Sequence, residues 1–468
     1  MVTVQDGLNS MPWVSLASLP AGYHVEVALP PPRDAHKYGY DLWSNGLAFE
    51  AFGIGRTYKV TLRIDGVGDG LWLFNFDTSG RLINVSYTGT RWGSQTISYP
   101  DYDPGFRLLP YPQYRPELHR LLGGTWLRAK WTGTFDHTGL VYRPEIVPPA
   151  DPFLSMALAA SDLLVRLLPD VSVDRLDNRA ADVLDLLRGL PVKSSNELAR
   201  ETERFHEILG GHIPRYIPVE PPELVWDHYH AIPLCVQTGC GGPCTFCSLY
   251  ERRIQVRPFS DVKRQIELLQ SYLGEEIDHF RKVVLLEGDS LTVPTDQLIQ
   301  ELEYSRGAFR LDPDAGFAHA FAKARTIVDR GETELRVLRA AGLMNVNVGL
   351  ESGCQTVLDL VKHGQQLEDV RAAASLLGGA GIKLSLNIIA GLGGALFAEQ
   401  HVHDTIQFVR TLPPGTQVFY SPLFVPGGSR YETQEERVFG RLDDEAIGKQ
   451  SIVFERELGA AEYMFVAM

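Results

Sequence analysis

Three of the five cysteines of this chain lie within one short stretch, QTGCGGPCTFCSLYERR (residues 237–253). Cys240, Cys244 and Cys247 follow a C-x3-C-x2-C spacing. A structural zinc site needs four ligands, and the chain has no second close pair of cysteines. A four-iron cluster can instead be held by three thiolates, with one iron left open to a small molecule. The spacing therefore predicts a [4Fe-4S] cluster with a reactive open iron.

The composition is that of an ordered, multidomain protein. The chain has 468 residues, of which 44% are apolar and 22% are charged, and no window of eighteen apolar residues occurs. We therefore expect two or three domains and no membrane span. The first residues, MVTVQDGLNSMPW, lack the basic flank and apolar run of a secretory signal. Together with an odd number of cysteines, this predicts a cytoplasmic protein with reduced thiols.

The net charge of −14 argues against nucleic acid as a partner, because a long duplex would meet overall repulsion. The basic runs in the sequence are short, such as YERRIQVRPF. We therefore expect a small molecule or a peptide as the partner.

The elements that position the cysteines follow from the periodicity of the sequence. Residues 231–425 alternate short apolar runs with helical patterns, from HAIPLCVQ through KVVLLEG, FAHAFAKA, NVNVGLES and KLSLNIIAG to TQVFYSPLFV. Six such repeats predict a parallel sheet with right-handed crossovers, closed into a partial (βα)6 TIM barrel. Ligands of such sheets lie at the carboxyl ends of the strands, and the cysteines follow the first strand.

The first half of the chain has a different texture. Short alternating stretches such as TYKVTLRI and LWLFNF predict β-hairpins. Apolar residues at helical spacing then predict three helices over residues 153–168, 173–190 and 195–211. The fold class is therefore α/β, with four parts. These are a β-rich N-terminal domain (1–150), a helical connector and linker (151–229), the partial barrel (230–430) and a C-terminal helical extension (431–468).

At the cysteines the sequence resembles the radical S-adenosylmethionine (SAM) superfamily, over about residues 230–430. Phe246 occupies the position before the third cysteine, where the family usually has an aromatic residue. The segment LLEGDSLTVPT resembles the family's second strand end, and NVNVGLESG resembles the GxES segment of the subgroup with the tRNA methylthiotransferases and nitrogenase-cofactor proteins. LNIIAGLGG resembles the GxIxGxxE segment, with Asn387 in place of its first glycine and Gly394 in place of its acid.

The resemblance implies cofactors and a set of contacts. It implies one [4Fe-4S] cluster bound by the three cysteines, and SAM bound at the open iron. The residues that the resemblance assigns to SAM are Phe246, Gly288, Asp289, Arg325, Glu351, Asn387, Ile389 and Gly391. Arg325 is expected to pair with the SAM carboxylate, because arginine binds carboxylates in a bidentate manner. Ser385 shares a strand face with Asn387 and is either a ligand contact or a barrel hydroxyl.

The resemblance also implies the reaction. A reduced cluster, supplied with electrons by a donor such as flavodoxin or ferredoxin, cleaves SAM to a 5′-deoxyadenosyl radical. The radical then abstracts a hydrogen atom from a small-molecule, natural-product or peptide substrate. Two alternatives stay open: an RNA-modifying radical SAM enzyme, and a cluster scaffold or assembly protein without turnover.

Two further cysteines and one further motif lie outside the cysteine triplet. Cys354 follows the fourth strand and is a candidate hydrogen-atom donor, although a buried residue at a helix start is the favoured interpretation. Cys235 is interpreted as part of the core. Asp34, His36 and Gly39 form a D-x-H-x-x-G pattern that marks cobalamin-binding domains, but prolines precede it and no βα units follow. We therefore do not expect cobalamin.

Overall fold

The computed structural model describes the second half of the chain almost continuously and the first half in separate segments. These are residues 13–16, 23–28, 58–64, 71–76, 79–87, 91–92, 95–96, 117–120, 124, 126–132, 141–167, 169, 189, 192–209, 231–242, 244–247, 253–274, 277, 280–312, 316–361, 364–423, 425 and 429–462. The D-x-H-x-x-G pattern and the helix expected over residues 173–190 lie outside these residues, so both stay predictions.

The chain divides into two compact units. The first comprises Met1–Glu207 and Leu273–His279, and the second comprises Ile208–Tyr272 and Phe280–Met468. The two helices described from the expected connector therefore group mainly with the N-terminal strands. Within the described residues, none of the helices combines the length and apolar character needed to cross a membrane.

The first unit contains an antiparallel sheet with the strand order β1-β2-β3-β4-β5-β8-β9-β10. Every neighbouring pair is antiparallel, including the expected hairpin of β3 and β4. A two-stranded ribbon, β6-β7, accompanies it. The strands are β1 (Trp13–Leu16), β2 (Tyr23–Ala28), β3 (Tyr58–Ile64), β4 (Leu71–Phe76), β5 (Leu82–Tyr87), β6 (Arg91–Trp92), β7 (Gln95–Thr96), β8 (Glu117–Arg120), β9 (Trp126–Thr132) and β10 (Val141–Val147).

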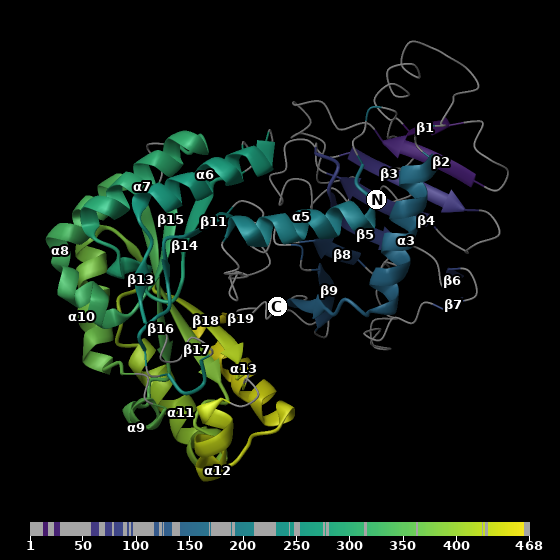
Figure 1. Ribbon diagram of the computed structural model, residues 1–468. Coiled ribbons are helices and arrows are strands. Elements are labelled where there is room, and N and C mark those ends of the chain that lie inside the picture. Colours follow the sequence, from purple (N-terminus) through teal and green to yellow (C-terminus); the bar gives the residue numbers. More distant parts are fainter. Residues whose placement is uncertain are drawn as a thin grey trace, which may run out of the picture. The chain divides into compact units, whose positions relative to one another are not determined.

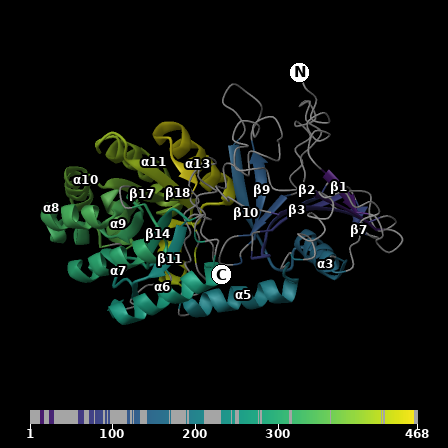
Figure 2. The same cartoon turned by 90° about the horizontal axis from the view of Figure 1, so that it is seen from above.

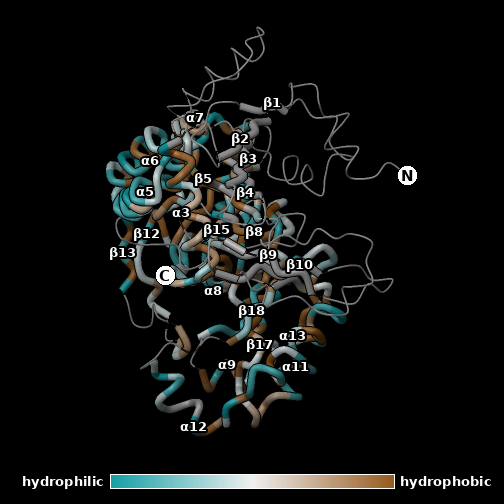
Figure 3. Tube along the Cα trace, turned by 90° about the vertical axis from the view of Figure 1, so that its right-hand side faces the viewer, coloured by the Kyte–Doolittle hydropathy of each residue, from teal (hydrophilic) through white to brown (hydrophobic). Residues whose placement is uncertain are grey.

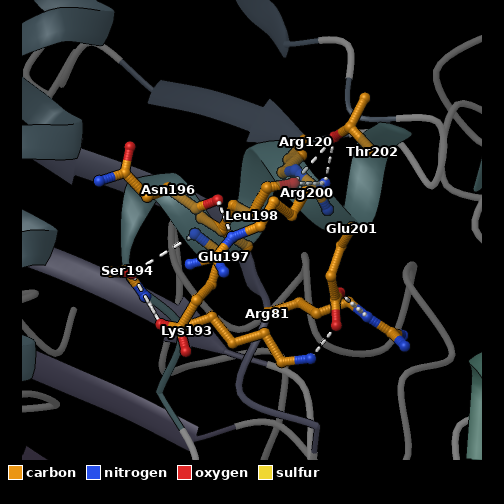
Figure 4. Close-up of polar contacts among 10 residues, drawn as sticks. All are labelled: Arg81, Arg120, Lys193, Ser194, Asn196, Glu197, Leu198, Arg200, Glu201 and Thr202. Atoms are coloured by element: carbon orange, nitrogen blue, oxygen red, sulfur yellow. Dashed lines mark hydrogen bonds and ion pairs between the residues drawn. The ribbon is translucent and has the colours of Figure 1, made fainter. Parts of the chain in front are cut away.

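Within the described residues, this unit also contains the helices α3 (Pro152–Leu167) and α5 (Ser195–Ile208). Phe153 of α3 stacks on the fully buried Trp72 of β4, with ring centroids 5.6 Å apart. The tube of α5 is mostly hydrophilic (Figure 3), and α5 is held to the sheet by charged groups (Figure 4). Arg81 donates to Glu201 at 2.7 Å, and the buried Arg120 donates to Thr202 at 2.9 Å. These polar contacts act together with the buried Leu198 and Phe205 of the helix.

The second unit contains a parallel sheet with the order β11-β14-β15-β16-β17-β18-β19. Its strands are β11 (Ala231–Cys235), β14 (Lys282–Leu286), β15 (Ala318–Ala322), β16 (Leu343–Glu351), β17 (Lys383–Ala390), β18 (Gln417–Pro422) and β19 (Ala461–Glu462). Every neighbouring pair is parallel. The α/β fold with a parallel sheet, consistent with a partial TIM barrel, is thereby confirmed. The sequence did not predict β19, which at two residues is too short to carry an alternating pattern.

The helices of the second unit follow the strands in βα order. They are α6 (Phe259–Leu273), the 3-10 turn η7 (Ser290–Thr292), α7 (Thr295–Ala308), α8 (Ala324–Ala341), α9 (Gln355–Leu360), α10 (Leu367–Ala380) and α11 (Gly394–Val409), then η8 (Tyr431–Glu435), α12 (Glu436–Phe439) and α13 (Asp444–Leu458). The helices α6, α7, α8 and α10 lie along one side of the strands (Figure 1), and the view from above shows the same order (Figure 2). A small ribbon, β12 (Gln237–Thr238) with β13 (Gln255–Val256), follows β11.

The two faces of the parallel sheet differ in polarity. Tyr420 of β18 hydrogen-bonds Glu455 of α13, so even-numbered positions of this strand face the helices. On the opposite face Ser385 of β17 bonds Asn345 of β16 at 2.8 Å and Gln417 of β18 at 3.2 Å. Buried parallel sheets usually carry apolar residues on both faces. The polar row therefore distinguishes this face of the sheet from the face that the helices cover.

Candidate functional site

The cysteine loop, which carries Cys240, Cys244 and Cys247, leaves the parallel sheet at the carboxyl end of β11, as the sequence predicts. Gly239 and Gly241 have φ angles of 75° and 61°, in the left-handed region that residues with a Cβ seldom adopt. The amide of Gly239 donates to the Glu287 carboxylate at 2.7 Å. Because Glu287 directly follows β14, this bond ties the start of the loop to the end of the neighbouring strand.

The three thiols lie on this loop outside any disulfide bond, and each is partly buried. Burial raises the pKa of Cys240, and burial together with the charges of Cys247 and Glu351 raises the pKa of Cys244 well above its usual value. The amide of Cys247 donates to the Cys244 carbonyl at 3.1 Å.

The arrangement of these thiols differs from that of a site for a single ion. Among the residues that the structure describes, no group of three His, Cys, Asp or Glu residues converges on one metal ion. Thiolates that each bind a different iron of a cluster need no common point, so the thiols can still serve a cluster.

A lysine that sequence reasoning missed reaches the cysteine loop. The ammonium group of Lys323 donates to the Cys240 carbonyl at 2.9 Å. A Cβ added to Gly242 would lie 3.1 Å from that ammonium nitrogen and 3.5 Å from the Cys244 sulfur. Lys323 therefore places a positive charge beside two of the three thiols. Its position directly before α8, at the carboxyl end of β15, was the available signal.

Arg325, which the resemblance assigns to the SAM carboxylate, has other contacts. Its side chain is 63% exposed and pairs with Asp329 at 2.9 Å and with Asp369 at 3.6 Å. The structure does not bring Arg325 together with the cysteine loop. The physical reason is that α8 begins at Ala324, so the extended Lys323 faces the strand ends while Arg325 lies in the first helical turn.

Asp289 and Gly288 form the turn after β14. Asp289 is only 2% exposed, and burial raises the pKa of its carboxyl group. Its two oxygens accept from the amide of Lys323 at 3.2 Å and from the Thr326 hydroxyl at 2.7 Å. The carboxylate thus fixes the start of α8, and with it the backbone that carries Lys323. The assignment of Gly288 and Asp289 to SAM stays a prediction.

Phe246 and Ile389 are brought together, although they lie 143 positions apart in the sequence. The half-buried Phe246 packs against a cluster that contains Ile389, Val357 and Tyr431. The loop is further fixed at Thr245, whose amide donates to the Val361 carbonyl at 3.1 Å. Phe246 therefore covers the carboxyl end of β17, where the resemblance expects SAM.

Asn387 and Glu351 lie at the carboxyl halves of β17 and β16. Asn387 is 9% exposed, and the carbonyl oxygen of its side-chain amide is buried without a hydrogen-bond partner in the described part of the chain. A buried oxygen of this kind is costly unless a partner is supplied. Glu351 has a φ of 60° next to a bulge between β16 and β17, and its charge acts on Cys244.

The two other cysteines are buried. Cys354 is 1% exposed within the same apolar cluster as Ile389, and burial raises the pKa of its thiol. It directly precedes α9, as expected for a residue at a helix start. Cys235 is fully buried in β11, and burial raises its pKa to about 11. The role of Cys354 as a hydrogen-atom donor stays a prediction.

A buried histidine that the sequence did not reveal connects two strand ends. His401 of α11 is fully buried, with one ring nitrogen 2.8 Å from the Ser352 hydroxyl and the other 3.1 Å from the Ile389 carbonyl. Burial lowers its pKa to about 4. The Ser352 hydroxyl also accepts from the Cys354 amide at 3.0 Å. The neutral imidazole therefore holds the ends of β16 and β17 in register.

Comparison with known proteins identifies the segment that carries this site. Residues 234–409 match the family model of the radical SAM superfamily. The match begins within β11 and ends with α11, so it includes the cysteine loop and the strand ends described above. The narrower resemblance of residues 345–353 to the GxES subgroup stays a prediction.

One curated relative and two solved structures illustrate the likeness. The chain is 27% identical over 178 residues to the anaerobic magnesium-protoporphyrin IX monomethyl ester cyclase of Rubrivivax gelatinosus. The matched segment covers 36% of this chain and 30% of the cyclase. Coproporphyrinogen III oxidase (HemN) from Escherichia coli, a radical SAM enzyme, is 18% identical over 51% of this chain and 54% of that chain, with a TM-score of 0.34. The radical SAM methyltransferase TsrM from Kitasatospora setae, solved with cobalamin and a [4Fe-4S] cluster, is 19% identical over 44% of this chain and 39% of that chain, with a TM-score of 0.32.

Proposed function

Residues 234–409 form a radical SAM domain, and we propose that the protein is an enzyme that binds one [4Fe-4S] cluster and SAM. Cys240, Cys244 and Cys247 are the proposed cluster ligands. The observation that carries the proposal is that these thiols share one loop at the carboxyl end of β11, and that Phe246 of this loop packs against the apolar cluster that contains Ile389 of β17. Ligands of parallel sheets bind at this edge.

The residues present fit both cofactors. Three thiols on one loop suit three irons, and no further cysteine lies on that loop to close the fourth corner. The buried carbonyl oxygen of Asn387 needs a hydrogen-bond donor, and the adenine of SAM carries an amino group that can donate. A bound cluster would supply the electron for reductive cleavage of SAM to methionine and a 5′-deoxyadenosyl radical, which would take a hydrogen atom from the substrate.

The side chains of this protein hold and shield that chemistry. Lys323 supplies a positive charge beside Cys240 and Cys244, which favours an additional electron at the site. Phe246 and the apolar cluster around Ile389 exclude water from the side of the loop that they cover. Asp289 fixes the backbone of Lys323, and His401 fixes the end of β17. Protein of this class supplies position and exclusion while the cofactor supplies the reactivity.

The substrate that we propose is a small molecule, a natural-product intermediate or a peptide, and the electron donor is a low-potential protein such as flavodoxin or ferredoxin. The buried row of Asn345, Asn347 and Ser385 supports a neutral, hydrogen-bonding ligand on that face of the sheet. The overall net charge of −14 is consistent with a substrate other than nucleic acid.

Anaerobic reconstitution with iron and sulfide tests the proposal. The reduced protein, incubated with SAM, should release 5′-deoxyadenosine in the presence of a chemical reductant, measured by liquid chromatography and mass spectrometry. The variant Cys244→Ala should release none. Absence of 5′-deoxyadenosine from the cluster-loaded parent protein with several reductants would favour a cluster scaffold instead.

A further inference from the structure

The glycine turn after β17, residues 391–394, is held by the C-terminal extension. Among the described residues, the segment that makes these contacts runs from Tyr431 to Gln450 and lies beyond the family match, which ends at residue 409. In Figures 1 and 2, α11 and α13 lie side by side next to β17 and β18. The turn begins with Gly391, one of the residues that the resemblance assigns to SAM.

Gln450 of α13 fixes the first glycine of the turn. The amide of Gly391 donates to the side-chain carbonyl of Gln450 at 2.7 Å, and the side-chain amide donates to the Ala398 carbonyl at 3.3 Å. Gln450 is 7% exposed, so it bridges the turn and the first turns of α11 away from water. Gly391 has a φ of 94°, which needs a glycine, and Ile447 of α13 packs directly against it.

Tyr431 joins the turn to the cysteine loop. Its backbone amide donates to the Thr245 carbonyl at 3.1 Å, between Cys244 and Phe246. Its phenolic oxygen accepts from the Gly393 amide at 3.3 Å. The side chain is 1% exposed and belongs to the cluster that contains Ile389. One residue therefore contacts both the loop that would carry the cluster and the turn beside which SAM would bind.

A third contact joins the backbone after the glycine turn to the backbone of the C-terminal extension. The amide of Ala395 donates to the Gly440 carbonyl at 3.0 Å. A Cβ added to Gly394 would lie 2.1 Å from that same carbonyl oxygen, closer than real Cβ atoms approach other atoms. Gly394 stands where the related segment has an acid. The loss of that acid therefore makes room for the C-terminal extension at the turn.

We propose that residues 431–458 are part of the SAM site, with Tyr431 and Gln450 as positioning residues that hold the glycine turn in register with the cysteine loop. This inference rests on the proposed function. Residues 431–458 then increase the affinity for SAM, in addition to the stability that any buried helix gives the fold. A merely structural extension would affect stability without affecting SAM binding in particular.

Two variants separate a role in SAM binding from a purely structural role. Tyr431→Phe keeps the ring in the apolar cluster and removes the acceptor for the Gly393 amide. Gln450→Leu removes the acceptor for the Gly391 amide. The matched control is Tyr420→Phe, which removes a hydroxyl that bonds Glu455 of the same C-terminal helix without touching the turn. Each variant is reconstituted as the full chain, and its iron content, thermal midpoint and SAM dissociation constant are measured, the last by equilibrium dialysis with the oxidised cluster.

All three variants should load as much iron as the parent protein. Tyr431→Phe and Gln450→Leu should bind SAM about tenfold more weakly, because without its acceptor the glycine turn leaves the binding position in the SAM-free protein. SAM binding must then restore the turn and bury an amide that has no acceptor, at a cost on the order of 1.4 kcal/mol, which corresponds to a factor of ten. Tyr420→Phe should lower the thermal midpoint and leave SAM binding unchanged. Equal SAM affinity in the parent and all three variants would overturn the inference alone. A parent protein that loads iron and binds no SAM would overturn the inference and the proposed function together.

Discussion

The buried imidazole of His401 makes the stability of this unit depend on pH in a calculable way. The native pKa is about 4, and the ordinary value is 6.5. Between these values the unfolded chain takes up a proton that the native protein does not, so stability increases with pH. The contribution is fully present above pH 6.5 and is lost as the pH falls through about 4. At pH 5 the parent protein should have lost about 2 kcal/mol of unfolding free energy through this group.

The variant His401→Gln isolates this contribution. Its amide does not titrate but can still donate to the Ile389 carbonyl, so the variant should lack this part of the pH dependence. Hydrogen exchange of peptides from β17, measured by mass spectrometry at pH 7.5 and pH 5 and corrected for intrinsic rates, reports the local unfolding free energy. Carboxylates elsewhere titrate equally in both proteins and cancel in the difference. An equal decrease in protection in the parent and the variant would show that the imidazole of His401 does not cause this pH dependence.

Three further predictions concern single side chains. Glu301 is fully buried in α7, and burial raises its pKa to about 7. The stability that this carboxyl group contributes below its ordinary pKa of 4.5 is therefore lost as the pH rises through 7. Between pH 4.5 and 8, denaturant titrations should show that the parent loses about 3 kcal/mol more unfolding free energy than Glu301→Gln. Gly353→Ala should destabilise the fold by about 3 kcal/mol or more, measured as the thermal midpoint, because the new Cβ would lie 2.4 Å from the Thr405 Cα. Lys323→Met should make the reduction potential of the cluster more negative in a redox titration, because it removes a positive charge that contacts the Cys240 carbonyl.

Controls for these variants are available in the same unit. Gly378→Ala changes a helical glycine of α10 with open space around it, so it should leave the thermal midpoint unchanged or raise it. Lys383→Met removes an exposed positive charge at the amino end of β17 and should leave the potential unchanged. If Glu301→Gln has the same pH dependence as the parent, the carboxyl group is not the cause. Equal midpoints for the two glycine variants, or equal potentials for the two lysine variants, would contradict the corresponding contact.

The sequence predicted those features of the fold that depend on local patterns. The βα order, the hairpin of β3 and β4 and the position of the cysteine loop all follow from periodicity and spacing within short windows. The start of α8 at Ala324 is difficult to predict, because the helix is interrupted at Gly331. A glycine within a helical pattern weakens the local signal of the turns before it. Sequence reasoning therefore considered Arg325 and missed Lys323, the extended residue before the helix.

Residues that act across long distances in the sequence escaped prediction. Tyr431 and Gln450 bind backbone groups of the glycine turn, and His401 binds the carbonyl of Ile389. A side chain that bonds to a distant backbone group leaves no pattern of residue types at either position, because every residue carries the same amide and carbonyl. The tertiary fold alone brings these groups together. Cys354 was partly predictable, because its place at a helix start follows from the segment LESGCQTV.

If the three thiolates hold an iron–sulfur cluster, its remaining iron is the one that binds SAM. Mössbauer spectroscopy of protein reconstituted with ⁵⁷Fe can decide this, because it resolves the individual irons. We expect about four irons per chain, of which one changes its spectrum when SAM is added while the other three do not. A spectrum that SAM leaves unchanged, or a purified protein that holds zinc at the cysteine loop in place of iron, would show that the thiolates do not hold such a cluster.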